Sequence, residues 1–342
     1  METIMAKRQR KINEYRQEMK CKDGNKIIQF THGRDLDGKI SGMIGELYAM
    51  SNCNDIQLEL IDNSAAFNEI ITKYISNRFK DYDIIIISDL TLNENNAAYL
   101  NELIEQEVDK EFIICDHHKA DYITENENYS WRKYCSRSED QQCGASLLYE
   151  ALKLSFPIQL RQAIRGVAET TRIYDNFIWK KTNDLVARNM SRISYLNPSY
   201  IEDLKTRILS LTSDSETLDL FSDEDKKMLL EEDERVNNYI ETKKKYTVVN
   251  KVYIDDRFYD VACTFATKYQ SELGSDICST MGVDFVCMIN PENNSISLRG
   301  HGKIDLSQVA KKYFNGGGHP DASGGCFDAS RLLVGLEHIF FN

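Results

Sequence analysis

The residues Asp83-Ile-Ile-Ile-Ile-Ser-Asp-Leu90 contain four consecutive isoleucines between turn-forming residues. The run has no polar alternation, so it predicts a strand that is buried on both faces, as in a parallel sheet. A similar run, Glu111 to Cys115, follows a segment with helical spacing at Asn93 to Gln106. Earlier strand candidates at Lys26 to Phe30 and Gln57 to Ile61 are also followed by helical segments. This alternation is typical of an α/β domain with a doubly wound parallel sheet.

Polar side chains follow three of these strands at the point where each strand ends. They lie at His32 to Asp37, at Asp89 and at Asp116 to His118. One such residue alone is usually a cap or a turn residue, but ligands of open α/β sheets bind beyond the carboxyl ends of the strands. Carboxylates that converge on one point repel each other unless cations lie between them. The combination of carboxylate and imidazole therefore predicts a site for Mn²⁺, Mg²⁺, Fe²⁺ or Zn²⁺.

The chain of 342 residues is longer than one hydrophobic core usually supports, so we expect two domains. Residues 1–182 form the predicted metal-binding domain, which begins with a basic helix at 1–22. Residues 183–245 have the pattern of a helical connector, which is strongly acidic between Asp214 and Arg235. In residues 246–342 strand-like segments return, and a helical segment precedes a glycine-rich stretch. This pattern predicts a smaller α/β domain.

The net charge is −12, from 42 basic and 54 acidic residues. This charge disfavours a protein that binds long nucleic acid by general electrostatics, but it is compatible with a small anionic substrate held by metal ions. No apolar run approaches the roughly 18 residues of a membrane-spanning helix, and the charged N-terminus does not resemble a signal peptide. Nine cysteines without a Cys-x-x-Cys pair favour reduced thiols, such as Cys115, Cys263 and Cys287, in a cytoplasmic protein.

Several short motifs follow one another along the chain: His32-Gly-Arg-Asp-Leu-Asp-Gly38, Ser88-Asp89, Asp116-His-His118 and Tyr174-Asp175. They resemble the four motifs of the DHH phosphoesterase superfamily. The stretch Asn315 to Gly324, with Leu298-Arg299 upstream, is similar to the DHH-associated domain that follows in these proteins. The resemblance extends over nearly the whole chain and implies a phosphoesterase with two metal ions.

The resemblance also implies the metal ligands. Six side chains would bind two divalent ions, with Mn²⁺ preferred and Mg²⁺ as the alternative: His32, Asp35, Asp37, Asp89, His117 and Asp175. His32 and Asp35 would bind one ion. Asp37, His117 and Asp175 would bind the other, and Asp89 would bridge both. Which of Asp35 and Asp37 binds which ion stays open, because the spacing from His32 to Asp35 varies among relatives.

Two catalytic residues are expected beside these ligands. Asp116 would hold an imidazole N–H and fix the tautomer of that ring. His118 would face the substrate phosphate and stabilise the charge that grows in the transition state. A hydroxide shared by the two ions would attack phosphorus, since paired cations lower the pKa of a water between them.

In the second domain, the resemblance implies that Arg299, Gly317, Gly318 and His319 bind the substrate. Successive glycine N–H groups can converge on an anion, and a guanidinium pairs with phosphate through two parallel hydrogen bonds. His301 either contacts the substrate or caps a turn.

The domain content narrows the activity within the superfamily. Processive RecJ-type exonucleases carry an additional OB domain, and pyrophosphatase relatives have a C-terminal domain without the Gly-Gly-Gly-His sequence. The chain is most similar to the oligoribonucleases (nanoRNases), which hydrolyse short single-stranded oligonucleotides to mononucleotides. Phosphatases of 3′-phosphoadenosine 5′-phosphate and cyclic dinucleotide phosphodiesterases are alternatives, and a nucleotide-binding sensor without turnover is an alternative of another class. Whether the substrate is RNA or DNA, and whether the protein forms a homodimer, stay open.

Overall fold

The computed structural model describes residues 24–107, 109–118, 141–211 and 218–328. The chain divides into two compact units between residues 229 and 230. The predicted basic helix at 1–22 lies outside the described residues. Within the described residues, no helix is both long and apolar enough to span a membrane.

Unit 1 is built on a four-stranded parallel sheet with the strand order β2-β1-β3-β4. Its strands are β1 (Lys26–His32), β2 (Asp55–Ile61), β3 (Ile84–Ser88) and β4 (Glu111–Cys115). The connecting helices are α2 (Leu36–Ser51), α3 (Ser64–Ser76) and α4 (Glu94–Gln106). The remaining helices of the unit are α5 (Gly144–Leu152), α6 (Ile158–Asp175), α7 (Ile178–Thr182), α8 (Leu185–Leu196) and α9 (Tyr200–Leu209). The predicted α/β fold with a parallel sheet is confirmed.

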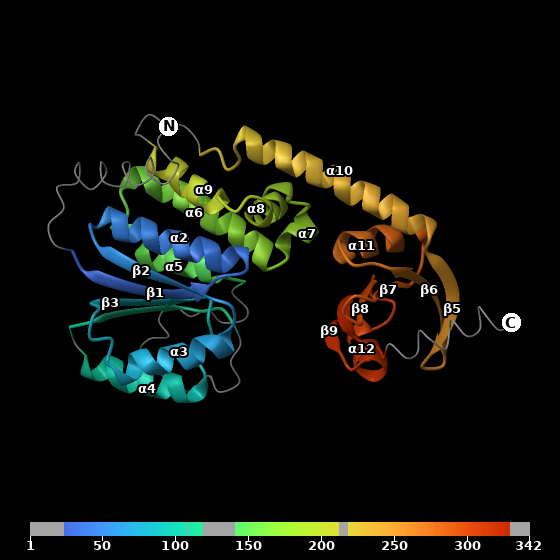
Figure 1. The fold of residues 1–342 in the computed structure, drawn as a ribbon, viewed down its shortest axis with the longest axis horizontal. Coiled ribbons are helices and arrows are strands. Elements are labelled where there is room, and N and C mark those ends of the chain that lie inside the picture. The colour runs from blue at the N-terminus through green and yellow to red at the C-terminus, as the bar shows by residue number, and fades with distance from the viewer. Residues whose placement is uncertain (1–23, 108, 119–140, 212–217, 329–342) are drawn as a thin grey trace. The chain divides into compact units, whose positions relative to one another are not determined.

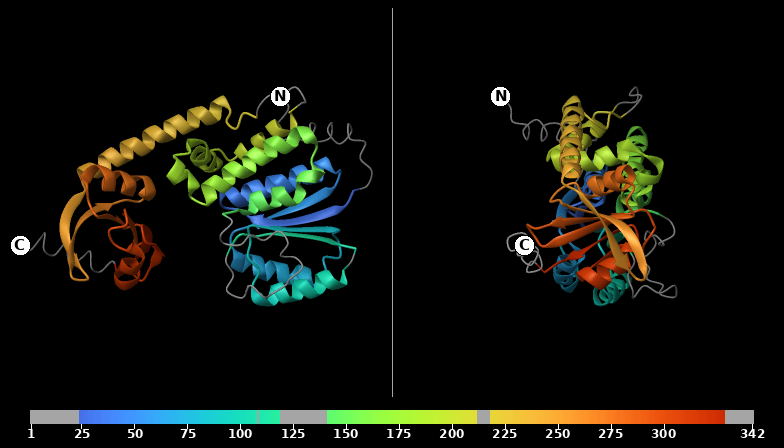
Figure 2. Two further views of the ribbon diagram at one scale, coloured as in Figure 1. Left: turned by 180° about the vertical axis from the view of Figure 1, so that it is seen from behind. Right: turned by 90° about the vertical axis from the view of Figure 1, so that its right-hand side faces the viewer.

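Helices cover both faces of this sheet (Figure 1). Ile84 and Ile86 of β3 belong to a core that includes residues of α2, α5 and α6. Ile85 and Ile87 belong to a second core with residues of α3 and α4. Figure 2 shows the same two layers of helices from behind. A strand that packs on both faces needs apolar side chains at every position, which explains the run of isoleucines.

Unit 2 contains a six-stranded mixed sheet with the order β5-β6-β7-β8-β10-β9. Its strands are β5 (Val248–Ile254), β6 (Arg257–Phe265), β7 (Phe285–Asn290), β8 (Ser295–Gly300), β9 (Gly317–His319) and β10 (Ala322–Cys326). Residues of α10 (Asp223–Lys245) and α11 (Gln270–Met281) pack on one face, and residues of α12 (Leu306–Phe314) pack on the other. Leu229 near the start of α10 still belongs to the core of unit 1, so one helix joins the two cores.

The glycine-rich stretch, which the sequence pattern left without regular structure, forms the hairpin of β9 and β10. Strand β10 pairs with β8 from Ala322 opposite Arg299 to Cys326 opposite Ser295. Strand propensity disfavours glycine, so pairing with β8 outweighs the local preference. Helix α11 was also not foreseen, although Leu273, Ile277 and Cys278 follow helical spacing and are buried.

The three cysteines that the sequence pattern singled out, Cys115, Cys263 and Cys287, form no disulfide bond. Cys53 departs from the expectation of reduced cysteines, because it is disulfide-bonded. Cys263 and Cys287 lie opposite each other on the parallel strands β6 and β7.

Candidate metal centre

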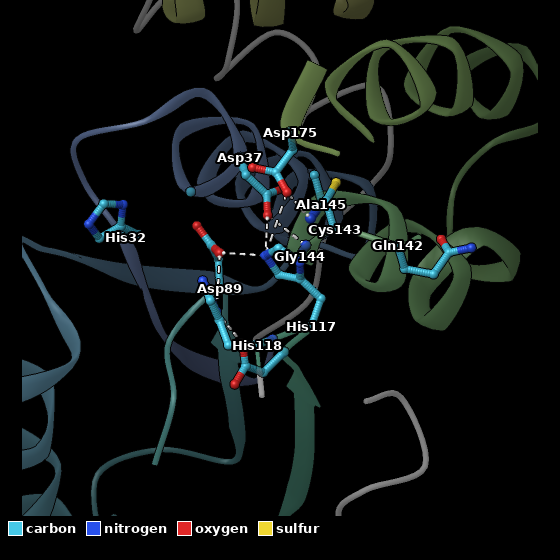
Figure 3. A network of polar contacts seen from close by, with 12 residues as sticks. His32, Asp37, Asp89, His117, His118, Gln142, Cys143, Gly144, Ala145 and Asp175 are labelled. Atoms are coloured by element: carbon cyan, nitrogen blue, oxygen red, sulfur yellow. Dashed lines mark hydrogen bonds and ion pairs between the residues drawn. The ribbon is translucent and has the colours of Figure 1, made fainter. Parts of the chain in front are cut away.

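The side chains that the motif resemblance assigns to metal binding meet at the carboxyl end of the unit 1 sheet (Figure 3). Asp89 directly follows β3, and His117 follows β4 by two residues. His32 ends β1, and Asp35 and Asp37 lie at the start of α2. Asp175, the last residue of α6, comes from a helix that follows the sheet in sequence.

Asp89 is the most confined carboxylate of the site. Its side chain is only 3% exposed, and its backbone is left-handed with φ of 55°. The Oδ2 atom is buried without a hydrogen-bond partner. Burial, followed by the charges of Asp37, Asp35 and Asp175, raises the pKa of Asp89 well above its usual value. A buried carboxylate oxygen without a donor is costly, and a cation beside it would remove that cost.

The imidazole of His117 lies among three carboxylates, as the dashed lines in Figure 3 show. Its Nε2 atom is 3.4 Å from Asp89 Oδ1 and 3.7 Å from both Asp37 Oδ2 and Asp175 Oδ2. Burial lowers the pKa of His117, which favours the neutral ring that metal coordination requires. Burial and the charges of Asp37 and Asp35 raise the pKa of Asp175 to about 7.

His32 and Asp35 form another group of possible metal ligands together with Asp89. His32 Nδ1 is 2.7 Å from Asp35 Oδ2, and its Nε2 is 2.9 Å from the carbonyl oxygen of Asp62. The second oxygen of Asp35 accepts a hydrogen bond from Gly38 N at 3.0 Å and caps α2. The cap fixes where this carboxylate stands relative to the first turn of the helix.

Asp37 is held by the N-terminus of α5, a contact that the sequence did not predict. Gly144 N donates to Asp37 Oδ2 at 2.6 Å, and Ala145 N donates to Oδ1 at 2.7 Å. A Cβ atom at Gly144 would lie 2.8 Å from the Cβ of Asp89, so only glycine fits here. Helix N-termini stabilise negative charge, and α5 begins at Gly144.

His118 is oriented by Asp116, and Asp116 by Thr91. His118 Nδ1 lies 2.8 Å from Asp116 Oδ1, and Thr91 Oγ1 donates to Asp116 Oδ2 at 3.0 Å. The hydrogen bond with Asp116 raises the pKa of His118 and favours its protonated form. The imidazole that Asp116 holds is therefore that of His118. Thr91 was not identified from the sequence, because a threonine after a strand has no distinctive pattern.

In the part of the chain that the structure describes, three groups of possible ligands occur, and in each the ligand atoms lie within 4.8 Å of one another: His32–Asp35–Asp89, Asp37–His117–Asp175 and Asp89–His117–His118. The first two coincide with the two ligand sets that the motif resemblance implies, with Asp89 next to both. Carboxylate oxygen and imidazole nitrogen are suitable donors for Mn²⁺, Mg²⁺, Fe²⁺ or Zn²⁺. Together with the partnerless Oδ2 of Asp89, this donor set fits divalent cations.

In unit 2, the structure places Arg299 and His319 in one row across the sheet. Ala322 of β10 lies opposite Arg299 on one side and opposite His319 on the other. Directly opposed residues point to the same face of a sheet. We call Arg299, Ala322 and His319 the Arg299–His319 row.

The row lies on the face that carries α11. The side chain of Arg299 packs against α11, where a Cβ at Gly274 would lie 2.6 Å from Arg299 Cγ. His319 is exposed, and Ala322 between the two residues is small.

The two glycines beside the row differ in their backbone. Gly318 has a φ of 139°, and a Cβ atom there would lie 2.7 Å from the carbonyl oxygen of Ala322. Gly318 therefore has to be glycine, whereas Gly317 has open space around its Cα. His301 follows β8 and is exposed.

No protein-family model matches the chain. It is 28% identical over 298 residues to oligoribonuclease NrnB of Bacillus subtilis, which covers 85% of this chain and 70% of that protein. It is 24% identical over 317 residues to a 3′,5′-cyclic-nucleotide phosphodiesterase of Helicobacter pylori, which covers 82% of this chain and 88% of that protein. A crystal structure of exonuclease RecJ bound to manganese aligns with a TM-score of 0.46 at 13% identity, over 96% of this chain and 91% of that chain.

Proposed function

Because the chain belongs to the DHH phosphoesterase superfamily and is a metal-dependent phosphoesterase, we propose that it hydrolyses short oligonucleotides to mononucleotides. The similarity to NrnB, an oligoribonuclease, supports this substrate class. The observation that carries the proposal is the convergence of two groups of possible metal ligands on the buried carboxylate of Asp89. An acidic cluster of this kind can bind a phosphate only if cations compensate its charge.

In this proposal two divalent ions bind between the six ligands, Mn²⁺ in preference to Mg²⁺. His32 and Asp35 would hold one ion, Asp37, His117 and Asp175 would hold the other, and Asp89 lies next to both sets. Such ions polarise phosphate oxygens and lower the pKa of bound water toward neutrality. The amides of Gly144 and Ala145 keep both oxygens of Asp37 in place, so the carboxylate needs little reorganisation when a cation binds.

The protein itself positions one proton. Asp116 accepts a hydrogen bond from Nδ1 of His118, which leaves Nε2 to face the substrate. Because the pKa of His118 is raised, a protonated ring is available to donate from Nε2 to a phosphate oxygen or to the leaving alkoxide. Charge that develops in the transition state then meets a donor that is already oriented.

Unit 2 also contacts the substrate in this proposal. The Arg299 guanidinium pairs with a phosphate of the oligonucleotide, and His319 contacts the same strand. Gly317 and Gly318 let the backbone approach the nucleotide closely. His301 adjoins the end of β8 and is a further contact to the substrate or a turn residue. A cytoplasmic location and a homodimer stay predictions.

The proposal is tested by incubating the protein with Mn²⁺ and a labelled five-nucleotide RNA. We expect progressive shortening to mononucleotides in the wild type and none in Asp89→Ala. If the wild type produces no shorter species, or if Asp89→Ala behaves like the wild type, the proposal is wrong.

A second candidate is a cyclic-nucleotide phosphodiesterase, because one relative carries that name. Parallel assays with a 3′,5′-cyclic nucleotide, a cyclic dinucleotide and 3′-phosphoadenosine 5′-phosphate rank these substrates by kcat/KM. Nucleotide binding without release of any product would favour the sensor alternative.

A further inference from the structure

Two aromatic rings are exposed beside the metal centre, and no role has yet been given to them. Phe177 lies two residues after Asp175, and its side chain is 55% exposed. Tyr195 lies in the last turn of α8, and it is 60% exposed. The segment that follows Asp175 thus presents one large ring to solvent just before α7 and another in the last turn of α8.

The backbone at Phe177 is unusual. Its φ of 56° and ψ of 16° place it in the left-handed region. A bulky residue rarely adopts this conformation, whereas glycine or asparagine does so readily. Phe79 and Tyr269 also have a left-handed backbone, but Phe79 is buried, whereas Phe177 combines this backbone with an exposed ring. Strained residues of this kind cluster at ligand sites.

A lysine lies against each ring. Lys180 Nζ is 4.9 Å from the centroid of Phe177 and 5.6 Å from that of Trp179. Trp179 stacks on Tyr174, the neighbour of Asp175, at 5.7 Å and 13°. Lys180 therefore lies close to both Phe177 and Trp179, and Trp179 packs on the neighbour of a predicted metal ligand.

Tyr195 lies next to Lys39 of α2, the helix that carries Asp37. Lys39 Nζ lies 4.3 Å from its ring centroid and donates to the carbonyl oxygen of Ser194 at 3.2 Å. Lys39 is two residues after Asp37 in α2. Burial and the negative charge of Asp35 raise the pKa of Tyr195, so the phenol lies within electrostatic reach of a ligand carboxylate.

The local charge differs from that of the whole chain. Residues 176–196 contain four basic side chains (Lys180, Lys181, Arg188 and Arg192) and one acidic side chain (Asp184), a formal charge of +3. The whole chain has a net charge of −12. Exposed aromatic rings with cations beside them are the usual means by which proteins bind single-stranded nucleic acid, because bases stack on the rings and phosphates pair with the cations.

We propose that Phe177 and Tyr195, with Lys180 and Lys39 against them, form a base-stacking platform for a short single strand whose phosphate reaches the metal centre. The inference rests on the proposed function, since it concerns the substrate of the same site. It explains how a protein with a large negative charge holds an oligonucleotide through unit 1. Because one base stacks on each ring, two rings can bind two bases of a short strand.

The test uses the variants Phe177→Leu and Tyr195→Leu, singly and together, in the full-length protein. The matched control is Tyr99→Leu, because Tyr99 in α4 is also 60% exposed but lies on a helix of the other sheet face. Each protein is assayed with a five-nucleotide RNA and with bis(p-nitrophenyl) phosphate, a phosphodiester without a base. Binding of a fluorescent, hydrolysis-resistant phosphorothioate pentanucleotide is measured separately.

We expect each leucine variant to weaken pentanucleotide binding and raise KM for RNA about tenfold. The ratio of kcat/KM for RNA to that for the base-free ester should fall by the same factor, and Tyr195→Phe should recover most of the affinity lost in Tyr195→Leu. Tyr99→Leu should bind the pentanucleotide like the wild type.

Two results would overturn the platform. The first is unchanged pentanucleotide affinity in the double variant. The second is an equal loss of activity on both substrates, together with a lower melting temperature or an altered oligomeric state. That result would mean that the rings pack against other parts of the protein or a second copy of the chain. A failure of the proposed function would give a different result: the wild type would not hydrolyse RNA at all, but pentanucleotide binding by the variants could still be measured.

Discussion

The metal centre of unit 1 and the Arg299–His319 row of unit 2 differ in how they hold charge. The metal centre brings four carboxylates together, of which those of Asp37 and Asp89 are buried, and Asp89 has an oxygen with no donor. The row consists of a half-buried arginine, a small residue and an exposed histidine on the sheet face that carries α11. The first arrangement is unfavourable until a cation binds, whereas the second is stable alone. Binding of metal should therefore change the stability of unit 1, and loss of the row should change substrate affinity alone.

The largest effect should follow from Asp89→Asn. We expect activity to fall about 1,000-fold or more, because the metal-derived stabilisation of the transition state amounts to several kcal/mol. In EDTA, however, the variant should melt at a higher temperature than the wild type, because it lacks a buried carboxyl with a strongly raised pKa. Oligonucleotide hydrolysis and differential scanning fluorimetry check the two parts. Equal melting temperatures in EDTA would contradict the electrostatic account.

A smaller loss should follow from Gly144→Ala. The new Cβ would lie 2.8 Å from the Cβ of Asp89 and 3.1 Å from Asp37 Oδ2, so both carboxylates have to move. We expect a decrease in kcat of about 100-fold, since displaced metal ligands or their hydrogen-bond partners cost roughly 10- to 100-fold. The matched control is Gly166→Ala in α6, where nothing lies within 4 Å of the added atom. That control should keep full activity and gain about 0.5–1 kcal/mol of stability.

A substitution in the Arg299–His319 row should affect substrate binding rather than metal binding. Arg299→Ala should raise KM for a five-nucleotide RNA about tenfold, because a hydrogen bond to a charged group contributes about 1.5–3 kcal/mol. Metal uptake and melting temperature should stay close to those of the wild type. Arg299→Lys should recover only part of the affinity, since lysine cannot form the two parallel bonds of a guanidinium. A lower metal affinity in Arg299→Ala would remove the distinction between the two regions.

The smallest effect concerns pH. The pKa of Asp175 is raised to about 7 in the folded protein, from about 3.9 in an unfolded chain. A carboxyl with a raised pKa stabilises the fold at low pH, and this contribution is lost as pH rises toward 7. In EDTA, the wild type should therefore lose more stability between pH 5 and pH 8 than Asp175→Asn does. Mn²⁺ should raise the melting temperature more at pH 8, because fewer protons compete for the ligands.

The sequence predicted the fold of unit 1 well and that of unit 2 less completely. Uninterrupted isoleucines such as Ile84 to Ile87 define a buried strand with little ambiguity. The strands β9 and β10 consist largely of glycine and small residues, and only the pairing of β10 with β8 and of β9 with β10 makes them strands. Local preference carries no information about a partner that is distant in sequence.

The candidate site shows the same limit. Motif residues such as Asp89 and His117 were found because they follow recognisable strands. The contacts of Gly144 and Thr91 were not found, because a backbone amide and a hydroxyl act through positions that the fold sets. Phe177 was not identified from the sequence for another reason: its exposure and its left-handed backbone are known only from the structure.

In the proposed function, Asp89 serves two divalent cations. Isothermal titration of the metal-free protein with Mn²⁺ tests this role. We expect uptake of two ions per chain, accompanied by release of protons at pH 7, and loss of at least one site in Asp89→Asn. Absence of stoichiometric uptake, or unchanged uptake in the variant, would contradict it.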